Sequence, residues 1–100
     1  MEKWADYVIF SVHYNHDKSR IEECKVAIDD GEIGTPFSQS RNRIVENLQT
    51  QKTYITIFKG TDQKYRRGDN VIFYMLDGEY FIRTDGNRIK KDNLGELPEY

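Results

Sequence analysis

The segment YFIRTDGNRIKKDNLG at residues 80–95 brings cationic and turn-forming side chains together late in the sequence. Residues 52–91 as a whole carry nine Lys and Arg against five Asp and Glu, a net of +4, although the chain has a net charge of −2. Arg holds phosphate through two parallel hydrogen bonds, Lys binds it as a point charge, and Tyr offers a face on which a nucleobase stacks. The pattern therefore predicts a site for a phosphate-bearing ligand of the nucleotide type. The predicted site residues are Lys64, Tyr65, Arg66, Arg67, Arg83, Asp85, Asn87, Arg88 and Lys90.

Two simpler interpretations of this basic segment stay open. Runs of charge are commonly solvated surface, and the Asp-Gly-Asn sequence at 85–87 is then an ordinary turn. Arg83 follows Ile82 in a predicted strand, and a buried Arg needs a carboxylate partner, which Asp85 or Asp69 can supply. Structural pairing therefore competes with ligand binding for this guanidinium group.

The other reactive side chains do not have the spacing of a catalytic or metal site. His13 and His16 lie near Cys24, but one is expected in a strand and the other in a turn, and structural zinc needs four ligands at regular spacing. Cys24 shares its predicted strand face with apolar residues, which is typical of an inert thiol rather than a nucleophile. The neighbouring Glu22 and Glu23 point to opposite faces of a strand, so they cannot flank one substrate bond. We therefore expect no metal, no cofactor and no enzymatic activity.

The composition predicts one small soluble domain that spans residues 1–100. Hydrophobic residues make up 37% and charged residues 32%, which suits one core beneath a surface of mixed charge. The single cysteine allows no internal disulfide, in keeping with a reducing compartment. The sequence begins without the basic start and apolar run of a signal peptide, and no apolar run approaches the ~20 residues of a membrane helix. We therefore expect a cytoplasmic protein without a membrane segment.

Hydrophobic periodicity predicts the elements of the first half of the chain. Residues 7–14, YVIFSVHY, and 21–28, IEECKVAI, alternate in the manner of strands and are separated by polar turn formers, so they predict a hairpin. Residues 29–37 hold two glycines and a proline and predict a loop. Apolar residues at helical spacing, preceded by serines that can cap a helix, predict a helix over residues 40–51.

The pattern of the second half of the chain predicts three strands. Residues 53–58, 71–76 and 79–84 are rich in β-branched and aromatic types, and the Asp-Gly pair at 77–78 predicts a tight hairpin between the last two. Residues 60–70 are polar and predict a loop, with at most a bent strand around its tyrosine. The fold class is α+β in the order β-β-α-β-β-β. We expect a curved antiparallel sheet or a small, partly open barrel with one packed helix, the last three strands forming a meander. Ile89, Leu94 and Leu97 are expected to hold the C-terminal segment against this sheet.

Several stretches resemble a family of short bacterial and phage proteins, a domain of unknown function. They are the frame ADYVI…V.YN at residues 5–15, the Ser-Arg pair at 40–41 and the closing segment YFIRTDGNRIKKDNLGELP at 80–98. The closing segment is the most specific part of a resemblance that covers nearly the whole chain. The family usually has a tryptophan before its loop glycine, whereas this chain has Tyr65 near Gly68. The resemblance implies a compact cytoplasmic domain, often carried on mobile elements, and brings no catalytic residues with it.

Three kinds of partner fit these observations. The first is a nucleotide-type small molecule, such as a messenger of host immunity, held without catalysis by cations, aromatic rings and backbone amides. The second is a host protein bound by the acidic N-terminal half or by an exposed edge strand, which can also pair with itself in a homodimer. The third is nucleic acid, against which the overall acidity argues.

Overall fold

The structure is a computed structural model that describes residues 3–59, 61–62, 64–86, 91–95 and 97–100. Within these residues the chain forms seven strands and one helix. In chain order the elements are β1 (Tyr7–Tyr14), β2 (Ile21–Ile28), β3 (Phe37–Ser40), α1 (Arg41–Gln49), β4 (Tyr54–Lys59), β5 (Tyr65–Asn70), β6 (Ile72–Leu76) and β7 (Glu79–Arg83).

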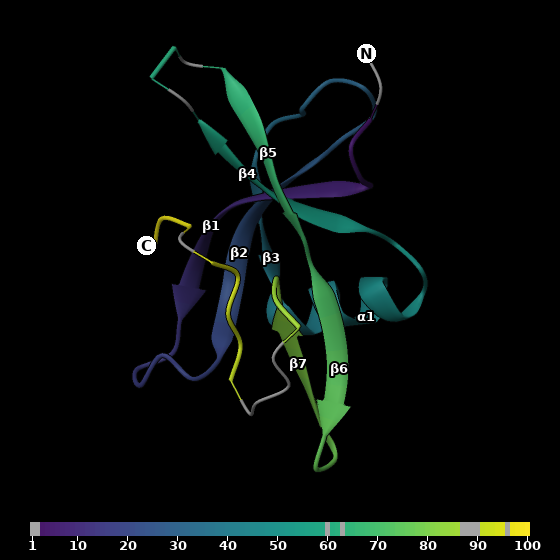
Figure 1. Cartoon of the computed structure of the whole chain (residues 1–100), viewed down its shortest axis with the longest axis vertical. Coiled ribbons are helices and arrows are strands. Elements are labelled where there is room, and N and C mark those ends of the chain that lie inside the picture. The colour runs from purple at the N-terminus through teal and green to yellow at the C-terminus, as the bar shows by residue number, and fades with distance from the viewer. Residues whose placement is uncertain (1–2, 60, 63, 87–90, 96) are drawn as a thin grey trace.

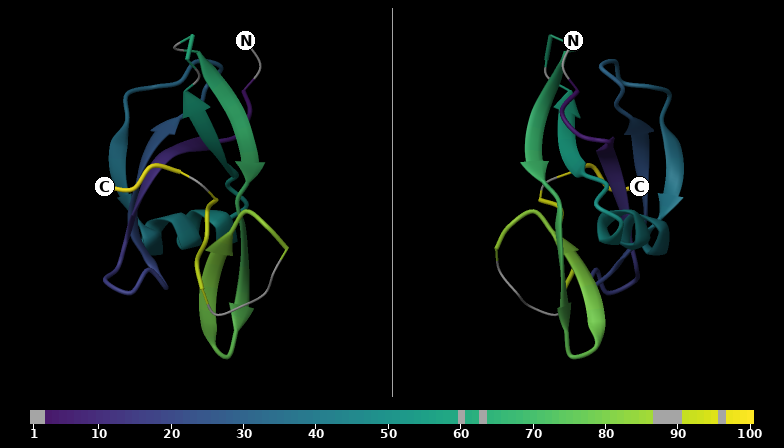
Figure 2. Two further views of the ribbon diagram at one scale, coloured as in Figure 1. Left: turned by 60° about the vertical axis from the view of Figure 1, so that its left-hand side comes forward. Right: turned by 90° about the vertical axis from the view of Figure 1, so that its right-hand side faces the viewer.

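The strands form two sheets rather than one. One sheet has five strands in the order β3-β2-β1-β4-β5, and β6 and β7 make a separate two-stranded sheet. Figure 1 shows the β6–β7 hairpin at the lower end of the molecule and the start of β5 at the upper end. The helix α1 contacts β2, β3 and β6, and Figure 2 shows it lying between the larger sheet and the hairpin. The fold is therefore α+β, and the larger sheet stays open instead of closing into a barrel.

The N-terminal hairpin forms as predicted because apolar side chains alternate along both of its strands. Val12 lies opposite Cys24 and Ile9 lies opposite Val26, and all four side chains are buried. The register of β1 against β2 shifts between Ile9 and Ser11. Such an irregularity bends a strand locally, and here it marks the place where β1 changes its partner on the other side.

The prediction of a purely antiparallel sheet is wrong, because β4 runs parallel to β1. Tyr7 lies opposite Tyr54 and Ile9 lies opposite Thr56 in this parallel pair. The cause is the crossover through α1. It carries the chain from the end of β3 to the end of the sheet at which β1 begins, so β4 starts beside the start of β1. The sheet is consequently mixed.

The predicted meander of the last three strands is also wrong. The 60–70 segment, predicted as a loop with at most a bent strand around Tyr65, contains the full strand β5, which pairs with β4 and keeps β6 out of the larger sheet. Gly68 permits this pairing, since a Cβ there would lie 2.3 Å from Thr56 Oγ1 and 2.7 Å from the Phe58 ring. The 29–37 segment, also predicted as a loop, ends in the short edge strand β3.

The helix and the last turn follow the predicted signals closely. Ser40 caps α1, because its hydroxyl oxygen accepts a hydrogen bond from the backbone N–H of Arg43 at 3.2 Å. In the turn between β6 and β7, Asp77 and Gly78 have φ angles of 52° and 80°. Two successive residues in the left-handed region are the signature of the type I′ turn that the Asp-Gly pair predicts.

Apolar side chains fill both faces of the larger sheet. The main core lies between that sheet, α1, the β6–β7 hairpin and the last residues of the chain, and it contains the buried Ile44 and Ile82. A smaller core on the opposite face contains Val8, Ile55 and Ile57, against which Phe10 packs. The second face is therefore not polar, and aromatic side chains at its margin are available to form a site.

The C-terminal strap, the described residues of 91–100, crosses from the hairpin to the larger sheet (Figure 1). Asn93 donates its backbone N–H to the carbonyl of Ile82 at 2.9 Å, which holds the strap beside β7. Farther along, Val12 of β1 donates its N–H to the carbonyl of Pro98, also at 2.9 Å. The strap thus joins two sheets that share no strand.

Leucine side chains anchor the strap in the main core. Leu94 and Leu97 are buried there, which confirms the prediction that they hold the C-terminal segment against the sheet. Ile89, predicted to do the same, lies outside the described residues.

A buried carboxylate fixes the start of the strap. Asp92 is 1% exposed and accepts hydrogen bonds of 2.9 Å from the backbone N–H groups of both Ile21 in β2 and Ile82 in β7. The guanidinium of Arg41, at the start of α1, donates to the same carboxylate at 2.7 and 3.2 Å. Arg41 also donates to the backbone carbonyl of Tyr80. One side chain therefore connects four parts of the fold.

We predict that Asp92→Ala lowers the free energy of unfolding by about 3–5 kcal/mol, because it leaves a largely buried guanidinium and two backbone N–H groups without their acceptor. Urea titration followed by circular dichroism measures the loss. The matched control is Asp62→Ala, which breaks an exposed pair with Arg66 and should change stability by no more than about 1 kcal/mol. Equal, small losses in both variants would contradict the central role of Asp92.

Candidate functional site

The predicted cations that the structure describes do not form one cluster. Arg66 and Arg67 lie in the first half of β5 and Lys64 directly precedes this strand, whereas Arg83 is the last residue of β7. Figures 1 and 2 show these two places apart in every view. Three further predicted site residues lie outside the described residues, namely Asn87, Arg88 and Lys90. The two described groups must therefore be considered separately.

Arg83 is held by structural contacts, in line with the pairing interpretation. Its side chain is 5% exposed, and it donates to both carboxylate oxygens of Asp85 at 2.6 and 2.9 Å. A third hydrogen bond of 2.9 Å reaches the backbone carbonyl of Lys91. The hydrogen bond with Asp85 raises the pKa of Arg83 above its ordinary value. This guanidinium therefore fastens the strap to β7, and its donors point inward rather than to solvent.

The residues at the start of β5 present a different environment. Arg66 forms an exposed ion pair with Asp62 at 3.0 Å. Tyr65 is 38% exposed, its ring meets Phe10 edge to face at a centroid distance of 5.6 Å, and the Lys59 ammonium lies 5.7 Å from its ring centroid. Aromatic and cationic groups therefore meet on this side of the sheet.

These rings border a hollow of about 460 Å³, which we call the fork hollow. It is lined by Phe10, Ser11, Ile57, Phe58, Lys59, Tyr65 and Pro98.

The fork hollow exists because β1 has two different partners along one edge. The β1–β4 pairing ends at Ile9 and Thr56. Three residues farther along β1, Val12 instead donates its backbone N–H to Pro98 of the strap. The hollow lies where the two partners diverge, so its lining comes from β1, β4, β5 and the strap. No local sequence pattern can reveal such a place.

Strand alternation adds a second cation to the same face. Arg67 follows Tyr65 by two residues in β5, so the two side chains share a face. Its partner in the register is Ile57, which lines the hollow. Arg67 and Lys59 therefore stand on the side of the sheet where the fork hollow opens, and Arg67 is exposed.

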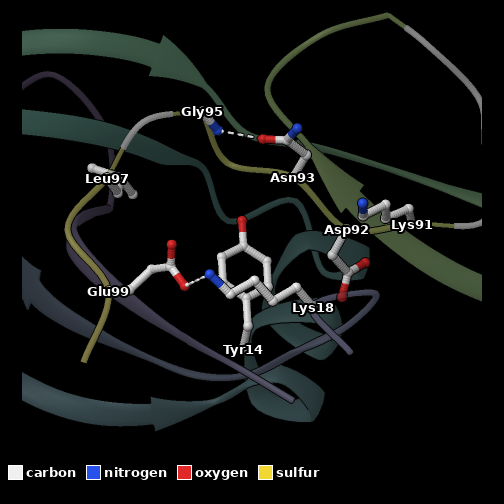
Figure 3. A pocket seen from close by; sticks show the side chains of 8 residues that line it. All are labelled: Tyr14, Lys18, Lys91, Asp92, Asn93, Gly95, Leu97 and Glu99. Atoms are coloured by element: carbon white, nitrogen blue, oxygen red, sulfur yellow. Dashed lines mark hydrogen bonds and ion pairs between the residues drawn. The ribbon is translucent and has the colours of Figure 1, made fainter. Parts of the chain in front are cut away.

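A second hollow, of about 470 Å³, lies on the other side of the strap (Figure 3). We call it the strap hollow. In Figure 3 the Tyr14 ring stands in its middle, and Lys18 extends past this ring to Glu99, with which it forms an ion pair at 3.2 Å. Burial raises the pKa of Tyr14. Its lining residues are Tyr14, Lys18, Lys91, Asp92, Asn93, Gly95, Leu97 and Glu99.

The two hollows differ in what they can bind. The strap hollow has one aromatic ring, and its lysines share the lining with the carboxylates of Asp92 and Glu99, which offset their charge. Among the described residues, the fork hollow is lined by Phe10, Phe58, Tyr65 and Lys59 and by no carboxylate. Aromatic residues with nearby cations suit a planar anionic ligand. We therefore take the fork hollow as the candidate site.

The sequence identified part of this site. Tyr65 and Arg67 belong to the predicted site residues, whereas Phe10, Phe58 and Lys59 were not predicted. Each of these three lies at or near the end of an apolar run, and no local feature separates it from a core or surface residue. They become site residues only because β4 pairs with both β1 and β5.

The described residues offer little for metal or thiol chemistry. In the part of the chain that the structure describes, no group of three or more His, Cys, Asp or Glu side chains could hold a metal ion. Cys24 is fully buried, and burial together with the nearby Asp92 carboxylate raises the pKa of its thiol to about 12. The thiol therefore stays protonated at neutral pH and is not a nucleophile in the folded chain.

These features define a small α+β domain with an aromatic and cationic hollow beside a mixed sheet. The chain belongs to the family described as "Protein of unknown function (DUF3892)", whose model matches residues 8–98. No curated protein and no solved structure matches the chain. Among the residues that the structure describes, no helix has the length and apolar character needed to cross a membrane.

We predict that Cys24 reacts with a thiol reagent only through opening of the native structure. Its burial and its raised pKa both disfavour the reactive thiolate, so labelling should be far slower in native buffer than in urea. A colorimetric thiol assay at pH 8 with and without denaturant measures both rates. Labelling of the native protein at the rate of the unfolded chain would contradict the buried position.

Proposed function

We propose that this protein is a non-enzymatic binding module that holds a small phosphate-bearing ligand of the nucleotide type in the fork hollow. The observation that carries the proposal is the meeting of the Phe10 and Tyr65 rings with cations on one face, around a hollow whose described lining contains no carboxylate. Binding of this kind needs recognition of a ring and of a charge, and the fork hollow offers groups for both.

The walls of the fork hollow suit the planar ring of a nucleotide-type ligand. Its volume of about 460 Å³ lies in the range of small-molecule sites, which is roughly 300–1,000 Å³. Tyr65 is 38% exposed and its ring meets Phe10 edge to face at the wall of the hollow, so this ring is accessible. Stacking of a base on one aromatic side chain contributes about 1–3 kcal/mol. Every nucleobase has such a face, so the walls select a planar ring and not a particular base.

Cationic side chains at the rim of the fork hollow suit the phosphate of such a ligand. Arg67 and Lys59 lie on the face that carries the hollow, and Lys64 is adjacent to Tyr65 in the chain. Arg66 lies between Tyr65 and Arg67 in β5, so its side chain points to the opposite face, where it is paired with Asp62 and stays outside the rim. Arg67 and Lys59 are therefore the cations that the rim offers to a phosphate.

A protein that binds such a ligand without converting it acts by lowering its free concentration. On a mobile element, a chain of this kind would sequester a nucleotide messenger that host immunity uses. The resemblance to a family of short bacterial and phage proteins supports this setting.

Calorimetry with mononucleotides, cyclic di- and trinucleotides and ADP-ribose tests the proposal. We expect binding of at least one of them, and we expect Arg67→Gln to weaken it about tenfold, the loss of roughly 1.4 kcal/mol. The matched control is Arg43→Gln, an exposed arginine of α1 far from the hollow in sequence, which should leave affinity unchanged. Tyr65→Ala should weaken binding, and Tyr65→Phe should retain it because the stacking face remains.

Two outcomes would overturn the proposal. One is the absence of binding heat with every ligand at protein concentrations well above micromolar. The other is tight, salt-sensitive binding of single-stranded DNA or RNA without any binding of the small ligands, which would assign the face to nucleic acid.

A further inference from the structure

A second group of rings lies near the fork hollow, at the end of the strap. The Tyr100 ring lies 5.5 Å from the His13 ring between centroids, and Tyr100 is 44% exposed. The Lys25 ammonium of β2 lies 5.4 Å from the centroid of the Tyr100 ring. We call Tyr100, His13 and Lys25 the second ring group. It repeats the arrangement of the fork hollow, where Tyr65 meets another ring of β1 and a lysine.

Strand alternation places both groups on one face of the larger sheet. In β1, His13 stands between Val12 and Tyr14, which both pack in the main core, so His13 points to the opposite face. Lys25 alternates in the same way with its buried neighbours in β2. Phe10 packs against the smaller core, which lies on that opposite face. The second ring group and the fork hollow therefore open on the same side of the sheet.

The strap connects the two places, and Figure 1 shows it ending beside β1. Tyr100 donates its backbone N–H to the carbonyl of Val12 at 3.0 Å, which fixes this end of the strap. Pro98, two residues earlier, lines the fork hollow. Phe10 and His13 are three residues apart in β1, roughly 10 Å at the rise of a strand. One small molecule can therefore contact both groups.

The charges beside Tyr100 favour a base there rather than a phosphate. Glu23 accepts a hydrogen bond from the Tyr100 hydroxyl at 3.0 Å, and the Glu22 carboxylate lies 3.6 Å from the His13 ring nitrogen. Carboxylates repel a phosphate, but they accept hydrogen bonds from the amino group of a base. The described lining of the fork hollow contains Lys59 and no carboxylate. A ligand that spans the two places is therefore expected to have its phosphate near the hollow and a second ring at Tyr100.

We propose that the ligand of this face is a dinucleotide, two nucleobases joined through their sugars and phosphate, bound in an extended form. This inference rests on the proposed function and names the class of nucleotide. One base lies in the fork hollow against Tyr65, and the other stacks on Tyr100. The phosphate link lies between the two rings, with Lys59 beside one ring and Lys25 beside the other. Tyr100 is then the residue that distinguishes a dinucleotide from a mononucleotide.

A longer nucleic acid strand suits this face less well than a dinucleotide. A strand gains affinity from successive phosphate contacts, and the chain has a net charge of −2. The carboxylates of Glu22 and Glu23 stand beside the second ring group, so the phosphate that follows a second base would meet like charge. The face therefore favours a short ligand with two rings.

Calorimetry with matched adenine ligands tests this class. We expect a linear dinucleotide of two adenosines with a 5′-phosphate to bind about tenfold more tightly than adenosine monophosphate, because it adds one stacked base. Tyr100→Ala should remove this advantage and leave the affinity for the monophosphate unchanged, which also shows that the fold is intact. Tyr100→Phe should keep the advantage because the ring remains. Tyr65→Ala should weaken the binding of both ligands.

The matched control is Phe37→Ala. Phe37 is 38% exposed, but it lies opposite Val26 of the main core in the register of β3 and β2, so its ring is on the other face of the sheet. This variant should keep the full advantage of the dinucleotide. Adenosine triphosphate controls for added negative charge and should bind more weakly than the dinucleotide.

The outcomes separate this inference from the proposed function. Equal affinity for the dinucleotide and the monophosphate, or triphosphate binding as tight as that of the dinucleotide, would overturn the dinucleotide class while the fork hollow stays a nucleotide site. A dinucleotide advantage that survives in Tyr100→Ala would do the same, and so would tighter binding of a longer oligoadenylate. Absence of binding with every one of these ligands would instead contradict the proposed function, and the dinucleotide inference with it.

Discussion

The carboxylate of Asp92 is the constraint from which most of this structure follows. It accepts hydrogen bonds from β2, from β7 and from the guanidinium of Arg41, and it is fully enclosed. A buried charge is costly unless every partner is in place, so this arrangement disfavours folds that separate these elements. The helix, the hairpin and the end of the chain are therefore positioned together, although they are distant in sequence.

The position of the strap decides the shape of the sheet beside it. Because the strap starts at Asp92 and ends against Val12, it takes one half of the β1 edge, while β4 takes the other half. Because β4 and the strap contact different parts of the same edge of β1, they separate from each other between these contacts. The fork hollow is the space between them. The contacts that attach the C-terminal segment thus also create the concavity to which we assign ligand binding in our proposal.

Residues of one chemical type serve different purposes according to burial. Arg83 and Arg41 are enclosed and donate to carboxylates and carbonyls, so their charge stabilises the fold. Arg67 is exposed on an edge strand, where its charge can face a ligand and also discourages pairing with another strand.

Local features of the sequence determined the first hairpin, the helix with its serine cap and the Asp-Gly turn, because periodicity, capping and left-handed turn residues act over a few neighbouring positions. They also indicated Tyr65 and Arg67 as site residues. Tertiary structure alone decided that β4 lies parallel to β1, that β5 rather than β6 joins the larger sheet, and that Asp92 is buried rather than part of a surface turn. Those choices depend on contacts between distant segments, such as the close approach of Gly68 to β4, for which a single sequence has no local pattern.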